Sequence, residues 1–327
     1  MDLARWLGRA WWVLCWVTLA LLAAFTIIRI WQPGESELVV GMAAVTPWPY
    51  FLAWVVAVAA LIRRKWRVAG VALAFIAIQI VLLWPTWRPD VTAAPAVGSW
   101  RLKVFDANVR FNNLDLHGIA EEIANDHPDV VTLEEFSEAN EKSLLSTGAV
   151  DRYHWRYLHP SDDSTGFAVW SDVPLTGSRT WYAGSHAEYS GVLNPAAGGP
   201  ISLLVVHTYA PYGAFEPQQW ANQLAAIKDR AARAPRPLIV AGDFNATGDM
   251  RQFRSILNEG LVDSAVARGQ GWQMTWPRNH HVVPPFLRPD HVLYSAGLTA
   301  TSYSLGTGHG SDHRPVKVTL ARAATSG

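Results

Sequence analysis

Residues 238–245 read LIVAGDFN, and this stretch decides how the second half of the chain is interpreted. Its apolar residues Leu238 to Ala241 predict a strand that is covered on both faces, and Asp243 and Asn245 follow directly. An apolar strand that ends in a carboxylate places a polar group at the rim of a sheet, where α/β proteins form their sites. The stretch therefore predicts a buried strand that delivers two polar side chains to a functional site.

The same pattern recurs between Trp100 and Arg322. We expect strands at 102–109, 129–133, 156–158, 166–170, 178–182, 201–208, 238–241, 291–294 and 316–320, and helices at 116–125, 218–232 and 250–258. Polar residues stand at six strand ends: Asn108, Glu134 with Glu135, His207, Asp243 with Asn245, Asp290 with His291, and Asp312 with His313. One such Asp is usually a cap or turn residue, but six endings in one domain favour a site. The mixed order of strands and helices predicts sheets sandwiched between helices.

Composition separates this domain from the amino-terminal part of the chain. The 327 residues are 50% hydrophobic and only 17% charged; ten of the 17 Trp precede residue 90, whereas all 11 His follow it. Basic and acidic residues number 27 each, so the chain is not a polycation of the kind that binds nucleic acid. The single cysteine, Cys15, excludes a disulfide framework and a cysteine-based zinc site.

Three long apolar runs precede residue 88. We expect transmembrane helices at about 10–29, 39–62 and 68–87, because crossing the hydrocarbon core takes about 20 apolar residues. Pro47 and Pro49 interrupt the second run, which therefore either starts near Pro49 or is kinked there. The expected organisation is a membrane domain at 1–88, a linker at 89–99, a globular domain at 100–322 and a tail at 323–327.

The distribution of basic residues predicts the orientation of these helices. Arg5 and Arg9 precede the first run, and the stretch 63–67 between the second and third runs holds four basic residues. The loop between the first two runs carries Glu35 and Glu37 instead. Because basic loops stay in the cytoplasm, we expect a multi-pass protein of the cell membrane with a cytoplasmic amino terminus and an extracytoplasmic globular domain.

Seven segments of the globular domain resemble a known family. They are FDANVRF, PDVVTLEEF, GFAVWSDVP, VVHTYAP, VAGDFNAT, RPDHVLYS and GSDHRPV. Their succession resembles the endonuclease/exonuclease/phosphatase superfamily with its DNase I-like fold over essentially all of 100–322, and GDFN and GSDH are the most specific elements. Membrane spans before an external domain resemble the teicoplanin-resistance-type membrane phosphatase branch. The resemblance implies a four-layer α/β sandwich and divalent-metal-dependent hydrolysis of phosphate esters or anhydrides.

The resemblance also implies a metal site. Glu135 corresponds to the family's metal-binding glutamate, Asp312 to a second metal carboxylate, and Asn108 to a first-strand asparagine that supports metal and phosphate. Hard oxygen ligands without cysteine favour Mg²⁺, with Mn²⁺ as an alternative. We therefore expect magnesium as the cofactor.

A catalytic set follows from the same resemblance. Asp243 corresponds to the residue that orients or deprotonates the attacking water, and Asn245 to a donor for the phosphoryl oxygens. His313 would contact the scissile phosphate, while Asp290 would fix its tautomer through the other ring nitrogen. Such donors stabilise the charge that develops in the transition state.

Three positions, Glu134, Pro289 and Tyr209, depart from the family pattern, and a fourth residue, Asp106, has two possible placements. Glu134 stands where glutamine is common, and strand alternation lets only one of Glu134 and Glu135 face the site, for which we expect Glu135. Tyr209 stands where many relatives have histidine, so either His207 or Tyr209 supplies the further phosphate-facing donor. Asp106 either faces the site or lies deeper in the sheet.

Two functions are compatible with this site. One is hydrolysis of a phosphate or pyrophosphate bond in a lipid-linked substrate such as an isoprenoid pyrophosphate; the other is cleavage of external nucleic acid by a membrane-tethered nuclease. Residues 98–327 hold 19 basic and 23 acidic residues, a net charge of −4, which disfavours binding of a polyanion. Tethering also concentrates the site near lipid headgroups. The apolar loop 282–287 is either a lip that contacts lipid or a packed surface loop. We favour the lipid-linked substrate, with the bilayer as partner, and leave the oligomeric state open.

Overall fold

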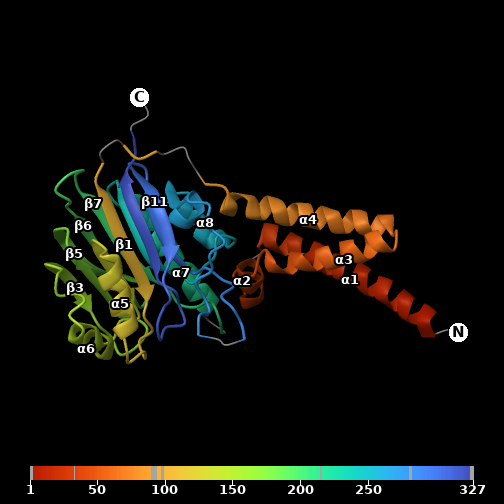
Figure 1. The fold of residues 1–327 in the computed structure, drawn as a ribbon, viewed down its shortest axis with the longest axis horizontal. Helices are drawn as coiled ribbons and strands as arrows, with labels where there is room; N and C mark the ends of the chain where they lie inside the picture. Colours follow the sequence, from red (N-terminus) through yellow and green to blue (C-terminus); the bar gives the residue numbers. More distant parts are fainter. Residues whose placement is uncertain are drawn as a thin grey trace. The chain divides into compact units, whose positions relative to one another are not determined.

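The computed structural model describes residues 3–32, 34–89, 94–96, 99–213, 216–279 and 282–324. The chain divides into two compact units, Met1–Pro85 and Thr86–Gly327 (Figure 1). Much of the expected linker 89–99 and the end of the tail lie outside the described residues. The described linker residues 94–96 pair with the end of the last strand, where the Ala96 amide donates to the Arg322 carbonyl at 2.9 Å.

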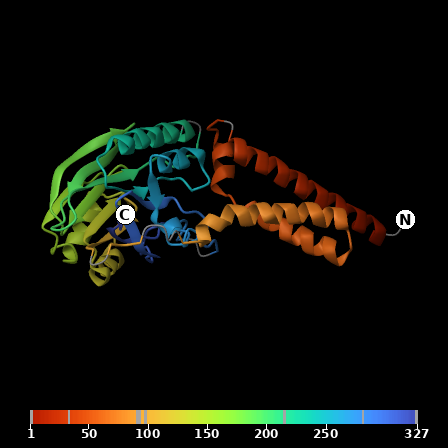
Figure 2. The same cartoon turned by 90° about the horizontal axis from the view of Figure 1, so that it is seen from above.

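The first unit is made of apolar helices. α1 (Leu3–Trp31) and α4 (Trp66–Trp87) are each long and apolar enough to cross a membrane, and α3 (Phe51–Ile62) runs beside them (Figure 2). One apolar cluster joins the three helices. Inside it, Trp54 Nε1 donates to Gln79 Oε1 at 2.8 Å, so the polar atoms of these two side chains satisfy each other.

The second expected span, 39–62, is not one straight helix. α2 (Glu37–Ala44) is separated from η1 (Trp48–Tyr50) and α3 by a bend of 63°. Pro47 and Pro49 lie at this break, because proline has no backbone N–H and disfavours helical geometry in the residue before it. The described residues thus include two helices that could cross a membrane, or three if the bent pair counts as one span.

Two six-stranded sheets form the second unit. The first has the order β11-β12-β1-β2-β4-β3 and the second β5-β6-β7-β8-β10-β9. The strands of the first are β1 (Arg101–Asn108), β2 (Val130–Glu134), β3 (Trp155–His159), β4 (Phe167–Ser171), β11 (Leu298–Leu305) and β12 (Val316–Arg322). Those of the second are β5 (Leu175–Ala183), β6 (His186–Leu193), β7 (Ile201–His207), β8 (Leu238–Asp243), β9 (Leu261–Asp263) and β10 (Asp290–Ser295).

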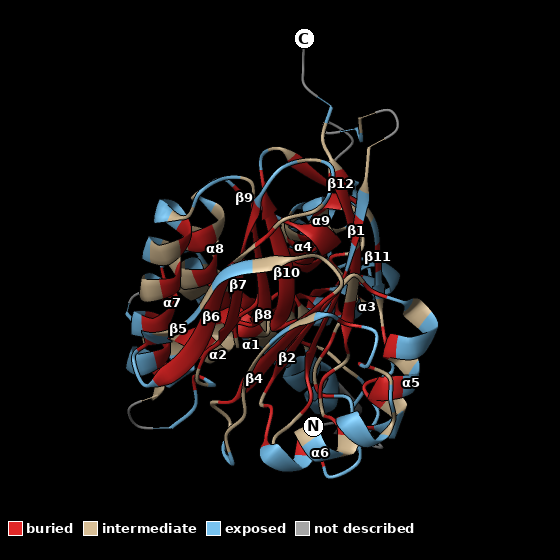
Figure 3. Ribbon diagram, turned by 90° about the vertical axis from the view of Figure 1, so that its left-hand side faces the viewer, coloured by how far each residue is buried: buried red, intermediate tan, exposed pale blue. Residues whose placement is uncertain are grey.

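The sheets face each other and helices cover their outer faces, which confirms the expected four-layer α/β sandwich. A core of buried side chains from both sheets fills the space between them. α5 (His117–Asp126) and α6 (Glu138–Ser146) cover the first sheet, and a second apolar cluster lies beneath them. α7 (Glu216–Arg233) and α8 (Arg251–Leu257) cover the second sheet. In Figure 3 the strands are buried while these helices expose their outer faces.

A parallel pair of strands lies at the centre of each sheet. β1 pairs in parallel with β2, and β7 with β8, whereas every other pairing of the described strands is antiparallel. Parallel strands end at the same edge of a sheet, so the polar residues that follow β1 and β2 share one edge, as do those that follow β7 and β8. This arrangement positions the candidate site.

Several elements were not expected from the sequence, namely β6, β9, β11, α6 and the short α9 (Ser264–Ala267). β6 places polar residues such as Glu188 on its buried outer face, so its apolar signal is weak. In β11 a bulge between Ala300 and Ser302 shifts the register and interrupts the alternation that would mark a strand.

A buried charged network joins β9 to β10. Arg288 Nη1 donates to Asp263 Oδ2 at 2.8 Å, and His291 Nδ1 lies 2.8 Å from the same oxygen. His291 Nε2 lies 2.9 Å from the carbonyl oxygen of Ala246. Burial alone would raise the pKa of Asp263, but the charges of Arg288 and His291 outweigh it and hold that pKa well below its usual range. His291 therefore belongs to a structural network rather than to the group of rim residues.

We expect Asp263→Asn to lower the free energy of unfolding by about 3–5 kcal/mol, because it leaves the Arg288 guanidinium buried without a counter-charge. Guanidinium-induced unfolding of the full chain in detergent, followed by tryptophan fluorescence, measures this loss. The exposed Asp162→Asn is the matched control. A loss equal to that of the control would show that the network contributes nothing to stability.

Candidate active site

The first sheet contributes an asparagine and a glutamate to the site. Asn108 is the last residue of β1, and its Nδ2 donates to Glu135 Oε1 at 2.9 Å. The same Nδ2 donates to Asp243 Oδ2 of the other sheet at 3.2 Å. Asn108 therefore bridges carboxylates from the two sheets.

Glu135 reaches the rim through its backbone conformation. β2 ends at Glu134, and Glu135 has a φ of +51°, in the left-handed region that residues other than glycine rarely adopt. Its Oε2 accepts a hydrogen bond from the Phe111 amide at 3.4 Å. The choice of Glu135 over Glu134 assumed that strand alternation continues to Glu135, but the strand ends at Glu134. The structure still places Glu135 against Asn108.

The second sheet contributes Asp243, His207 and Asn245. Asp243 is 1% exposed, and its Oδ1 accepts from the Asn245 amide at 2.8 Å. His207 Nδ1 lies 2.8 Å from the Ser164 carbonyl oxygen, which fixes the proton on that nitrogen. Its Nε2 lies 3.8 Å from Glu135 Oε1 and 3.9 Å from Asp243 Oδ2, so the free ring nitrogen faces the rim.

Asn245 lies beside Asp243 in a left-handed conformation, with a φ of +45°. Its Nδ2 donates to the Thr208 carbonyl at 2.8 Å and lies 3.4 Å from Asp243 Oδ2. The amide is thus held at the rim by the second sheet itself.

His313 and Asp290 form the most tightly held pair of the site. His313 Nδ1 lies 3.0 Å from each carboxylate oxygen of Asp290, and Asp290 Oδ2 also accepts from the Thr275 hydroxyl. His313 Nε2 lies 3.6 Å from Asp243 Oδ2. Burial alone would lower the pKa of His313, but the charges of Asp290 and Asp243 raise it to about 10, so the ring is cationic at neutral pH.

Asp312 lies at the more open side of the rim. Its Oδ2 accepts from Trp276 Nε1 at 3.2 Å, and Arg110 Nε lies 4.0 Å from its Oδ1. Its side chain is 28% exposed, whereas that of Asp243 is 1% exposed. Asp312 is thus the more exposed of the two carboxylates, and its described side-chain contacts are with Trp276 and Arg110 rather than with Glu135 or Asn108.

Tyr209 does not join this group in the described contacts. Its hydroxyl lies 2.6 Å from the Ser185 hydroxyl, and its ring packs on His186 with centroids 4.2 Å apart. Because Nε2 of His207 faces Glu135 and Asp243, His207 is the residue of this strand that the structure places at the rim.

A second layer of carboxylates, Asp106 and Glu134, lies beneath the rim. Asp106 accepts from the Thr132 hydroxyl at 2.6 Å, while its other oxygen and both oxygens of Glu134 have no hydrogen-bond partner within the described part of the chain. Burial raises the pKa of Asp106 to about 8 and raises that of Glu134 well above its ordinary value, with repulsion from Asp106 adding to the effect. Asp106 thus lies deeper in the sheet, the second of the two expected placements. Asp106 and Asn108 are two residues apart on β1, so they lie on the same face of the sheet, and this spacing is the sequence feature that indicates the deeper position of Asp106.

The rim carries more negative than positive charge. Burial raises the pKa of Asp243, and the nearby carboxylate of Asp290 raises it further, although His313 and His207 oppose both effects. Asp243, Asp290 and His313 also lie close enough together to hold a metal ion. A site with this excess of buried carboxylates and hard oxygen donors fits a divalent cation.

Comparison with solved structures identifies the fold. The chain resembles an endonuclease/exonuclease/phosphatase from Beutenbergia cavernae, with 18% identity and a TM-score of 0.52 over 68% of this chain and 72% of that one. It resembles D. rerio TDP2, solved in complex with a single-strand DNA product, with 20% identity and a TM-score of 0.54 over 67% and 98% of the two chains. A family protein from Bacteroides thetaiotaomicron has 14% identity and a TM-score of 0.54 over 70% and 97%.

Comparison of the sequence with family profiles identifies the family. Among curated proteins, none matches this chain in sequence. Residues 107–313, by contrast, match the Endonuclease/Exonuclease/phosphatase family, and this range begins next to Asn108 and ends at His313. The DNase I-like sandwich and the match over most of the globular domain agree. The chain therefore belongs to the Endonuclease/Exonuclease/phosphatase family, whose members are metal-dependent hydrolases of phosphate ester bonds.

Proposed function

We propose that this chain is a membrane-anchored, extracytoplasmic, Mg²⁺-dependent phosphohydrolase that cleaves a phosphate ester or pyrophosphate bond of a lipid-linked substrate. The observation that carries the chemistry is the meeting of Asn108, Glu135, Asp243 and the His313–Asp290 pair at one rim. The apolar helices before this domain carry the membrane part of the proposal.

Asp243 acts on the attacking water. Its Oδ1 is held by the Asn245 amide and its Oδ2 by Asn108, so the carboxylate is fixed in position at the rim. Burial and the neighbouring Asp290 raise the pKa of Asp243, which makes it a stronger proton acceptor than an exposed aspartate. Asp243 thereby orients the water and receives its proton.

His313 holds the phosphoryl group. Asp290 occupies its Nδ1, which leaves the Nε2–H to donate to a phosphoryl oxygen. The positive charge of the ring opposes the negative charge that develops on that oxygen in the transition state. Asn245 and His207 lie on the second sheet at the same rim, beside the carboxylate of Asp243.

Glu135, Asp312 and Asn108 are the residues that would hold Mg²⁺. When bound there, the cation neutralises charge on the phosphoryl oxygens and so promotes attack by water. Asn108 already joins Glu135 to Asp243, which explains how its side chain supports both the metal ligands and the water-activating carboxylate.

The loop between Trp276 and Leu287 supports a lipid-linked substrate, because its base contacts Asp312. Trp276 contacts Asp312 and also pairs with Leu287, which closes the base of the loop. Within the loop, the side chains of Val282 and Val283 are 91% and 42% exposed. Exposed aliphatic side chains close to a phosphate site suit a ligand with a lipid tail.

The charge distribution supports an extracytoplasmic domain. Arg63, Arg64, Lys65 and Arg67 stand between α3 and α4, and basic loops stay in the cytoplasm. An odd number of spans with the amino terminus inside carries the globular domain to the outside. This assignment treats the bent pair of α2 and α3 as one span.

A nuclease is the second candidate. One structural relative, D. rerio TDP2, is described in complex with a single-strand DNA product. The net charge of −4 on residues 98–327 argues against it here, because nucleic-acid affinity arises chiefly from neutralisation of phosphates by basic residues.

A hydrolysis panel on the purified full chain tests the proposal, with phosphate release measured for lipid and nucleotide substrates and fragment length measured for DNA. We expect turnover of an isoprenoid pyrophosphate with Mg²⁺, loss of turnover with chelator, and little cleavage of single-stranded DNA. Phospholipids and nucleotides complete the panel as alternative phosphate substrates. Efficient DNA cleavage without hydrolysis of any lipid phosphate would establish the nuclease instead.

Glu135→Gln should lower turnover at least about 10²-fold and weaken Mg²⁺ binding, because a ligand charge is lost while the side-chain volume is preserved. The hydrogen bond from Asn108 persists to the new amide oxygen and only the longer one from the Phe111 amide, at 3.4 Å, is lost, so the melting temperature should fall little. Steady-state phosphate release and Mg²⁺ titration measure both effects. Glu138→Gln, on an exposed residue of α6, is the matched control. If Glu135→Gln stays active and Glu134→Gln does not, the assignment is wrong by one residue.

The His313–Asp290 pair should behave as one unit. We expect His313→Ala to lower kcat roughly 10²–10³-fold through loss of one stabilising donor. Asp290→Asn should lose part of the same effect, and the double variant should be little worse than His313→Ala alone, because groups that act together are non-additive. Steady-state kinetics of the four proteins measure this coupling, and multiplicative losses would show that the two residues act independently.

A further inference from the structure

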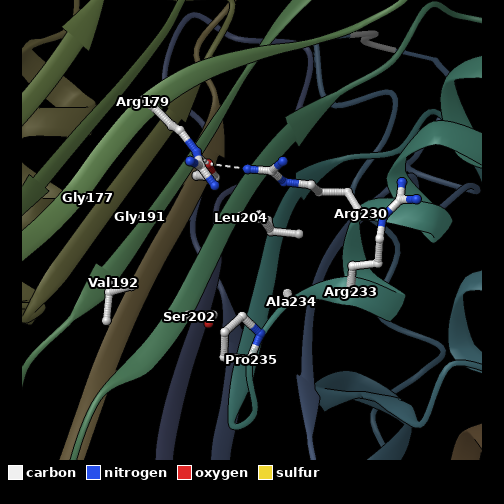
Figure 4. A pocket seen from close by; sticks show the side chains of 11 residues that line it. Gly177, Arg179, Gly191, Val192, Ser202, Leu204, Arg230, Arg233, Ala234 and Pro235 are labelled. Atoms are coloured by element: carbon white, nitrogen blue, oxygen red, sulfur yellow. Dashed lines mark hydrogen bonds between the residues drawn. The ribbon is translucent and has the colours of Figure 1, made fainter.

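A pocket lined by arginines lies in the outer face of the second sheet, apart from the rim. It has a volume of about 370 Å³ and is bounded by β5, β6, β7 and the last turn of α7. Figure 4 shows Arg179, from β5, and Arg230, from α7, extending toward each other above Leu204, with Arg233 beside them. Strand and helix therefore bring the guanidinium groups of Arg179 and Arg230 together over one hollow, which Arg233 also lines.

These arginines have no acidic partner in the part of the chain that the structure describes. Within the described residues, none of Arg179, Arg230 and Arg233 forms an ion pair with a carboxylate. Arg230 Cζ lies 5.5 Å from the ring centroid of Trp181, which holds its side chain in place. Burial lowers the pKa of Arg230, and the charges of Arg179 and Arg233 lower it further. The cluster is therefore a concentrated positive charge on a domain whose net charge is negative.

Two buried serines complete the pocket. Ser190 Oγ accepts from Arg230 Nη2 at 2.9 Å and from Arg179 Nε at 3.2 Å. Because both guanidinium groups donate to this oxygen, the Ser190 hydroxyl keeps its own hydrogen for an incoming acceptor. Ser190 and Ser202 are 6% and 7% exposed, so their hydroxyl groups lie at the floor of the hollow.

A bulge in β5 contributes to this convergence. The pairing of β5 with β6 shifts register between Thr176 and Arg179, and Gly177 within the bulge has a φ of +60°. After the bulge Arg179 stands opposite Ser190, and a bulge of this kind re-aims the side chains that follow it. The carboxyl-terminal dipole of α7 favours arginines at 230 and 233, but it does not account for an arginine from β5 that faces them.

We propose that this pocket binds a phosphate group of an anionic ligand at a site separate from the catalytic rim. Guanidinium forks and a hydroxyl donor are the groups that recognise phosphate oxygens. Ser202 lies five residues before His207 on β7, roughly 16 Å away at the rise of a strand, so one phosphate cannot occupy both sites. The ligand is either a soluble phosphate compound or a lipid headgroup.

Inorganic pyrophosphate is the probe for this site. The full chain in nanodiscs of phosphatidylcholine is titrated calorimetrically in the presence of EDTA, so that binding through a divalent cation is excluded. We expect Arg179→Gln/Arg230→Gln to weaken binding at least tenfold and Arg179→Gln alone, at an exposed position, to weaken it less. Arg101→Gln/Arg156→Gln removes the same charge from two other exposed strand positions and should change the affinity less than twofold.

The His313→Ala variant separates this site from the catalytic rim. It should bind pyrophosphate as the unaltered chain does, whereas loss of binding would place the anion at the rim and overturn the proposal. Equal losses in the two double variants, or no binding by the unaltered chain, would also overturn it. So would binding of single-stranded DNA without binding of pyrophosphate.

Nanodiscs that contain phosphatidic acid distinguish the two sources of phosphate. A headgroup in the pocket would compete with pyrophosphate, so phosphatidic acid would weaken the apparent affinity of the unaltered chain for pyrophosphate. The already weak affinity of Arg179→Gln/Arg230→Gln would then be the same with and without phosphatidic acid. An unchanged affinity, with the pocket variant still defective, assigns the site to a soluble phosphate compound. Either result leaves the catalytic proposal untouched, because no turnover is measured.

Discussion

The face-to-face packing of the two sheets is the constraint on which the site depends. Each sheet has a parallel pair at its centre, β1 with β2 and β7 with β8, and an apolar core holds the sheets together. The hydrogen bonds of Asn108 to Glu135 and to Asp243 then cross from one sheet to the other. Any slip between the sheets would separate residues that must act on the same phosphate.

This packing also concentrates carboxylates in a place of low water access. Asp106, Glu134, Asp243 and Asp290 are all buried near one another, with His313 as the cation among them. Burying like charges is unfavourable unless protons or cations compensate them. The same feature therefore accounts for the raised pKa values of Asp106, Glu134 and Asp243, for the raised pKa of His313 and for the fit of a divalent cation.

The sequence was most informative where an element is apolar on both faces. The buried run 201–208 and the stretch LIVAGDFN mark β7 and β8 because a strand covered on both sides has no polar alternation. β6 was missed because Glu188 and Ser190 lie on its helix-covered face, and β11 because its bulge breaks the pattern. The proximity of Asn108 and Asp243 across the two sheets was expected from the family resemblance. Hydrophobic periodicity could not predict it, because the two residues are far apart in the sequence.

Some features require three-dimensional information. The left-handed backbone conformation of Glu135, and not strand alternation, determines where its side chain lies. Tyr209 lies on the correct strand end, yet its ring packs on His186, away from the carboxylates. The arginine pocket combines Arg179 with two residues of α7 that are about 50 positions away, so spacing alone gives no sign of it.

The central claim is that metal and phosphate share one site at the rim formed by both sheets. Electron–nuclear double resonance of Mn²⁺ bound to the purified full chain, recorded with and without inorganic phosphate, tests this claim most directly. We predict a ³¹P coupling to the manganese signal that is present only when phosphate is added. Bound Mn²⁺ that shows no ³¹P coupling at saturating phosphate would contradict the account.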